Sequence, residues 1–61
     1  MATFDVPGVG TVIVTIDEQE FYQGGYVLRS LETAVRPDGS QVTGEDLERV
    51  TAHLRGVGAI Q

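Results

Sequence analysis

The sequence contains no cysteine, lysine, asparagine or tryptophan, and it has a single histidine. The absence of cysteine excludes disulfides and thiolate metal sites, and one imidazole cannot build a structural zinc or iron–sulfur site within one chain. We therefore expect no metal and no cofactor. Lysine and asparagine have AT-rich codons, so their joint absence points to a GC-rich genome or one of its phages.

Basic charge and long apolar runs are also scarce. Nine acidic residues against four arginines give a net charge of −5, which disfavours binding to nucleic acid or anionic lipid, because both require clusters of basic residues. Apolar runs such as Val12-Ile13-Val14 are far shorter than the roughly 20 residues of a membrane span. We expect a cytoplasmic protein that contacts neither nucleic acid nor membrane.

The length of 61 residues allows one small domain, residues 1–61. A chain of this size buries only about 60% of the surface of its unfolded form, and natural proteins of this size usually add disulfides, a metal or oligomerisation. Because the first two are missing, we predict self-association, as a homodimer or larger assembly, or docking on a protein partner.

The N-terminal third predicts a β-hairpin. Residues 3–6 run into Pro7-Gly8, which suits a type II turn because proline fixes φ and glycine accepts a positive φ. The returning segment, residues 11–16, alternates as a strand does. The polar residues 17–19 predict a break after it, and Gly24-Gly25 predicts a bulge, a bend or a close backbone approach in the next extended segment.

Residues 26–35 fit two structures. Their leucines and Val35 have helical spacing, whereas their β-branched and aromatic content favours a strand. We expect a strand; a helix would instead give a hairpin followed by two helices. Residues 36–39, Arg-Pro-Asp-Gly, predict a type I turn closed by a left-handed glycine, followed by a short returning strand over 40–42.

One C-terminal helix is predicted from Thr43 to Gly56. Thr43 and Asp46 resemble a capping box, with aspartate in the Glu/Gln position. The apolar stripe that would face a sheet consists of Leu47, Val50, Thr51 and Leu54. The predicted fold class is therefore α+β: a small antiparallel β-meander of three to five strands with one C-terminal helix packed on the sheet.

The candidate chemical groups favour a protein that is not an enzyme. His53 is predicted off the centre of the helix stripe, one turn after the cation of Arg49, which suits a surface or boundary histidine better than an acid–base group. Neither Ser30 nor Ser40 lies in a nucleophile motif. The carboxylates around Asp17 lack the alternating ligands of a calcium loop, so we predict no metal site.

The candidate interface residues are Tyr22, Tyr26 and Arg29, because tyrosine and arginine are enriched at binding hot spots. In the alternative, the rings of Phe21, Tyr22 and Tyr26 all cover the small core. A second candidate surface is an acidic face made of Asp17, Glu18, Glu45, Asp46 and Glu48. Carboxylates in a first helical turn are also favoured by the backbone dipole, which is a purely structural explanation for the last three.

Three functions follow from these residues. We expect a small non-enzymatic protein-interaction or assembly module, of the kind found among phage or prophage accessory and structural proteins. The first alternative is an acidic inhibitor that blocks a nucleic-acid-binding protein by charge mimicry. The second is a very small enzyme whose site forms between subunits, and it would depend on His53.

Overall fold

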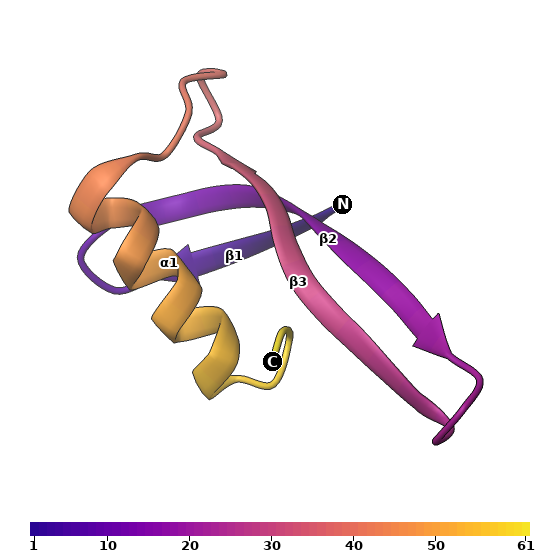
Figure 1. Cartoon of the computed structure of the whole chain (residues 1–61). Coiled ribbons are helices and arrows are strands. Elements are labelled where there is room, and N and C mark those ends of the chain that lie inside the picture. The colour runs from indigo at the N-terminus through magenta and orange to yellow at the C-terminus, as the bar shows by residue number, and fades with distance from the viewer.

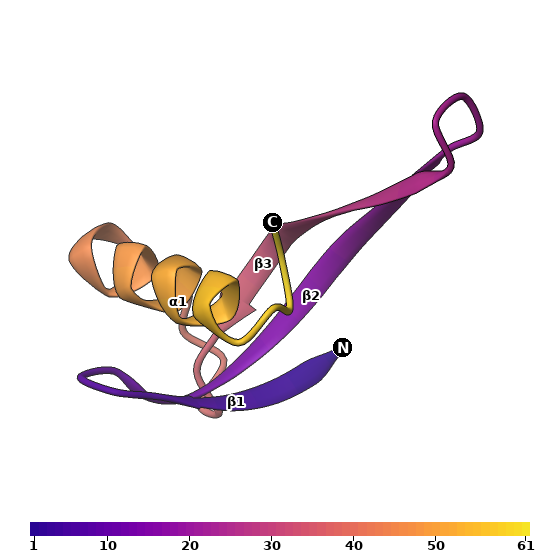
Figure 2. The ribbon, with the colours of Figure 1, turned by 90° about the horizontal axis from the view of Figure 1, so that it is seen from below.

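The computed structural model describes all 61 residues. Strands β1 (Ala2–Val6), β2 (Gly10–Phe21) and β3 (Tyr26–Val35) precede helix α1 (Gly44–Gly56). The strands form one antiparallel sheet in the order β1-β2-β3, and α1 crosses one face of it (Figures 1 and 2). The predicted α+β meander with a C-terminal helix is confirmed, with three strands.

The turn between β1 and β2 is the predicted one. The N–H of Val9 donates to the carbonyl of Val6 at 3.0 Å, and Gly8 between them has a φ of +82°. Residues with a Cβ rarely adopt such a φ, so glycine permits this tight connection. The turn sets the register of the hairpin, in which Val6 pairs with Gly10 and Ala2 with Val14.

The core lies between α1 and the part of the sheet nearest the β1–β2 turn. Val50 and Leu54 of α1 are fully buried, but Leu47, predicted in the same stripe, is 37% exposed. The sheet ends at β3, so no strand lies beyond it to cover Leu47. The buried side chains, all apolar, are Val6, Val12, Val14, Ala34, Val42, Val50, Leu54 and Ile60.

Residues 17–19 continue β2, so the predicted break is wrong. Each of them pairs with a residue of β3 between Leu28 and Ser30, and these cross-strand pairs hold the polar stretch extended. Gly24-Gly25 lies in the turn between β2 and β3, where its φ values are +107° and +65°. The irregularity lies elsewhere: Thr15 pairs with Thr33 and Ile16 with Leu31, which leaves Glu32 as an extra residue in β3.

Residues 26–35 form a strand, which excludes the alternative with a second helix. The turn that follows closes as predicted: the N–H of Gly39 donates to the carbonyl of Arg36 at 2.9 Å, and Gly39 has a φ of +91°. The expected strand over 40–42 is reduced to one bridge, between Val35 and Gln41. Val42 then leaves the sheet edge toward α1.

The capping box at the start of α1 is absent. Thr43 is the N-cap residue with an extended backbone, but its side chain makes no capping hydrogen bond. Asp46 instead accepts from two guanidinium groups, Arg36 at 2.7 Å and Arg49 at 2.9 Å. These charged donors are stronger partners for a carboxylate than a backbone N–H. The helix ends at Gly56, as predicted.

Candidate functional site

The distal half of the β2–β3 hairpin projects past α1 (Figures 1 and 2). We call residues 17–30 the hairpin arm. The arm contributes no residue to the buried core, and the molecule is 39 Å along its longest axis against 20 and 18 Å along the others. Both faces of the arm are therefore available to another molecule.

Strand alternation divides the arm into two faces. Ile16 and Leu31 face α1 and pack on the core, and the next pair on that face is Glu18 with Arg29. The opposite face carries the pairs whose side chains alternate with these: Asp17 with Ser30, Gln19 with Leu28, and Phe21 with Tyr26. Phe21, Tyr26 and Leu28 thus share the face turned away from α1, whereas Val27, which pairs with Glu20, lies on the other face.

Four residues lie near this end, and we call them together the aromatic tip: Phe21, Tyr22, Tyr26 and Leu28. The rings of Phe21 and Tyr26 stack with centroids 4.8 Å apart and planes at 15°. Tyr22, in the turn, is 91% exposed, and Tyr26 is 55% exposed. None of these side chains packs on the core cluster, so the alternative in which the rings cover the core is wrong.

Arg29 does not join the two tyrosines. It lies on the face of the arm that continues toward α1, where its Nε is 3.7 Å from a carboxylate oxygen of Glu18, and both side chains are about half exposed. Such an exposed pair adds little to stability. The sequence-based set of Tyr22, Tyr26 and Arg29 is thereby split between the end of the arm and its base.

Gln61 anchors the base of the arm. Its backbone N–H donates to the carbonyl of Arg29 at 3.1 Å, and its side-chain amide donates to the carbonyl of Val27 at 3.0 Å. The N–H of Arg29 donates to the side-chain oxygen of Gln61. Arg55 holds the other side of Gln61 by donating to its backbone oxygen at 3.1 Å. Ile60 of the tail is buried, whereas the role of Gln61 has no local sequence signal.

The acidic residues do not form one continuous face. Asp17 and Glu18 lie in the arm, whereas the other three lie in the first turns of α1, at the opposite end of the molecule (Figures 1 and 2). Asp17 and Glu18 also point to opposite faces of the sheet by alternation. Asp46 is paired with two arginines, and Glu45 is 3.6 Å from Arg49. Glu48 has no ion-pair partner.

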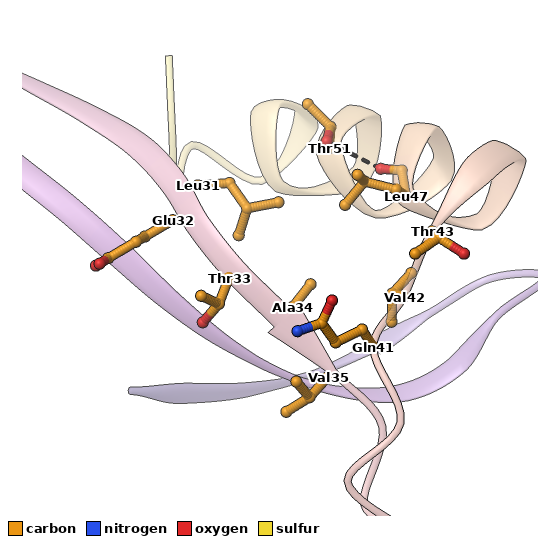
Figure 3. A pocket seen from close by; sticks show the side chains of 10 residues that line it. All are labelled: Leu31, Glu32, Thr33, Ala34, Val35, Gln41, Val42, Thr43, Leu47 and Thr51. Carbon is orange, nitrogen blue, oxygen red and sulfur yellow. Dashed lines mark hydrogen bonds between the residues drawn. The ribbon is translucent and has the colours of Figure 1, made fainter.

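A groove of about 640 Å³ runs between β3 and α1. Figure 3 shows Leu31 and Ala34 on one side of it, and Leu47 and Thr51 on the helix side. The Thr51 hydroxyl donates to the carbonyl of Leu47 at 2.9 Å. The one charged residue that lines the groove, Glu32, points away from α1 (Figure 3). The groove is therefore a packing surface of apolar and neutral side chains.

Few groups offer acid–base or metal chemistry. Hydrogen bonds from the hydroxyl and then the N–H of Ser40 lower the pKa of the Asp38 carboxyl below its usual 3.8, which reflects a tight turn. His53 is partly buried in the last turns of α1. No three His, Cys, Asp or Glu side chains lie close enough together to hold a metal ion.

Comparison with protein-family models, curated proteins and solved structures gave no match. No helix in the structure has the length and apolar character needed to cross a membrane.

Proposed function

We propose that this chain is a small non-enzymatic protein-interaction or assembly module, and that the aromatic tip of the hairpin arm is its contact surface. One observation carries the proposal: Tyr22 is 91% exposed and Tyr26 55% exposed on an arm that contributes nothing to the buried core. The partner is another protein or a further copy of this chain, and we take the cytoplasm as the place where it acts.

The chemistry of the tip supports this function. Tyrosine and phenylalanine bring a large apolar area with few rotatable bonds, and a tyrosine hydroxyl can hydrogen bond to a partner. Phe21 and Tyr26 are already stacked, at 4.8 Å between ring centroids, so part of the contact surface is ordered before binding. A preformed surface loses less conformational entropy on association.

The arm base supports the same function. Gln61 ties both Val27 and Arg29 to the C-terminal tail, and Ile60 fixes that tail in the core. The arm is thus attached to the body through its second strand as well as through β2. A rigid support at the base would present the tip in a defined direction.

The acidic-inhibitor alternative has less support. Charge mimicry requires unpaired carboxylates at regular spacing on one surface, whereas Asp46 lies between Arg36 and Arg49 and Glu18 lies beside Arg29. The enzyme alternative would use His53, which lies on α1 away from the arm. The inhibitor alone is an outcome of the experiment below.

Photo-crosslinking in the native host would test the proposal. A photoreactive phenylalanine replaces Tyr22 in one variant and Val57, which is 56% exposed on the tail, in a matched control. We expect one dominant crosslinked protein from position 22 and none from position 57. A basic nucleic-acid-binding protein crosslinked instead from Glu48, at the start of α1, would favour the inhibitor, and absence of a crosslink at position 22 would contradict the proposal.

A further inference from the structure

The outer edge of β1 has no partner. Ala2 to Val6 pair with β2 on one side, and α1 packs on one face of the strand. The hydrogen bonds to β1 outside the strand ladder are local: the N–H of Val9 donates to the carbonyl of Val6, and the Thr11 hydroxyl donates to Asp5 at 2.9 Å. An edge strand of this kind presents unpaired N–H and C=O groups that can pair with another strand.

The opposite edge of the sheet is covered at both ends. Gln61 bonds to β3 at Val27 and Arg29. Residues 40–42 bond to it at Ala34 and, just past the strand end, at Arg36. The molecule thus has one protected edge and one open edge.

β1 also lacks the features that usually prevent edge-to-edge pairing. The strand contains no lysine and no proline, and its register with β2 is regular from end to end. It carries one charge, Asp5, out of the nine carboxylates of the chain. β1 is therefore a place where two copies with a net charge of −5 each can meet with little local repulsion.

We propose that a second copy of this chain pairs antiparallel along β1, which gives a six-stranded sheet across a two-fold axis. The register that uses the whole strand places Phe4 opposite Phe4 of the second copy and Asp5 opposite Thr3 of the second copy. A register centred on Asp5 would oppose two carboxylates, which is unfavourable. In the favoured register the Thr3 hydroxyl can donate to the carboxylate that faces it.

The pairing would also cover Phe4. This side chain is partly buried and packs at the margin of the core. It lies on the α1 face of the sheet, because it is two residues from the buried Val6 on the same strand. Two phenylalanines directly opposite each other on neighbouring strands form a favourable cross-strand pair. The two cores would meet at this point.

The proposed pairing uses up the β1 edge of both copies, so it adds no third copy. A two-fold interface uses the same edge in both copies, and the edges left at the two ends of the six-stranded sheet are the β3 edges, which Gln61 and residues 40–42 already cover at both ends. A dimer, rather than a fibre, is the end point. The dimer does not depend on the proposed function of the arm, but it would carry two arms and so bind a repeated partner with avidity.

Charge substitutions at Thr3 test this register by sedimentation equilibrium. Thr3→Glu places a carboxylate opposite Asp5 of the second copy, and Thr3→Arg places a cation there. Two such pairs form per dimer, so we expect the dimer Kd to rise about 2- to 30-fold with glutamate and to fall by a similar factor with arginine. Thr3 is exposed, so both variants should fold.

Gln23→Glu and Gln23→Arg are the matched controls, because they make equivalent charge changes at the exposed end of the arm. The β1 dimer is supported if the two Thr3 substitutions shift the dimer Kd in opposite directions while the two Gln23 substitutions change it little. A dimer Kd that shifts only with the Gln23 substitutions would show that copies meet through the arm. That result overturns the β1 dimer but agrees with the proposed function of the arm. A chain that stays monomeric at millimolar concentration also overturns it, without bearing on a separate partner of the arm.

Cysteine crosslinking gives a second test, because the chain has no natural thiol. Thr3→Cys and Asp5→Cys are made in separate chains. The proposed register brings position 3 of one copy opposite position 5 of the other, within the Cα distances that a disulfide bridges. Mild oxidation of the mixture should give a mixed disulfide dimer far faster than either variant alone. Equal rates in all three samples would overturn the register.

Discussion

Gln61 and Arg29 are joined by hydrogen bonds in both directions although 32 positions separate them along the chain. The N–H of Arg29 donates to the side-chain oxygen of Gln61, and the N–H of Gln61 donates to the carbonyl of Arg29 at 3.1 Å. Gln61 thus bonds to the edge of β3 much as a further strand would. The consequence is mechanical, because the base of the hairpin arm is fixed to the body.

Replacing Gln61 with alanine should loosen this base. The substitution removes the side-chain bonds to Val27 and Arg29 but keeps the backbone bond. These bonds are exposed, so we expect the free energy of unfolding to fall by only about 0.5–1.5 kcal/mol. The Arg29 amide should exchange with solvent markedly faster, by hydrogen-exchange NMR. Unchanged exchange at Arg29 would show that the side chain does not hold the arm.

The two leucines of α1 should respond differently to truncation. Leu54 is fully buried and Leu47 is 37% exposed. Leu54→Ala should cost about 2–5 kcal/mol, which is comparable to the whole stability of a domain this small and should unfold much of the population. Leu47→Ala should lower the free energy of unfolding clearly less, as measured by urea denaturation of both variants. Equal costs would contradict the observed packing of α1.

Glycine at position 8 is required by its backbone conformation. Its φ is +82°, and a Cβ there would meet Arg49 at an ordinary contact distance of 3.5 Å. Gly8→Ala should therefore destabilise the protein by about 1–2 kcal/mol through backbone strain alone. Gly56→Ala is the control, since no atom lies within 4 Å of the added Cβ and its φ is not positive. We expect it to be neutral or stabilising by less than about 1 kcal/mol, measured by thermal denaturation.

The turn after β3 should respond to acid through Asp38. Hydrogen bonds from Ser40 lower the pKa of this carboxyl in the folded state below its usual 3.8, so its stabilising contribution is fully present above that unfolded value. That contribution is lost as the pH falls through the lower folded value. Ser40→Ala removes the hydroxyl and should raise the pKa of Asp38 part of the way back, because the backbone bond from residue 40 remains. An NMR titration in which the variant and the natural protein give the same pKa would contradict this assignment.

Local patterns in the sequence were enough to predict the meander, the Pro7-Gly8 turn and the helix end at Gly56. Errors arose where a distant residue decides the structure. The polar residues 17–19 are extended because β3 pairs with them. Asp46 leaves its capping position because Arg36, ten positions earlier, binds it.

The candidate site was predicted in part, for the same reason. Tyr22 and Tyr26 lie together near the end of the arm, as a short hairpin requires. Arg29 was grouped with them by its place in the sequence, but strand alternation turns it to the other face, beside Glu18. Gln61 could not be recognised, because its partners on β3 are set by the path of the tail across the fold.

Isothermal titration of the crosslinked partner, once purified, measures whether the aromatic tip is the contact surface. The natural chain is compared with Tyr22→Ala, Tyr26→Ala and the control Val57→Ala. We predict that each tyrosine substitution weakens the Kd at least about tenfold, as expected of a hot-spot residue, while Val57→Ala changes it less than about twofold and circular dichroism is the same for all. Tyrosine variants that bind as tightly as the natural chain would contradict a role for the arm in recognition.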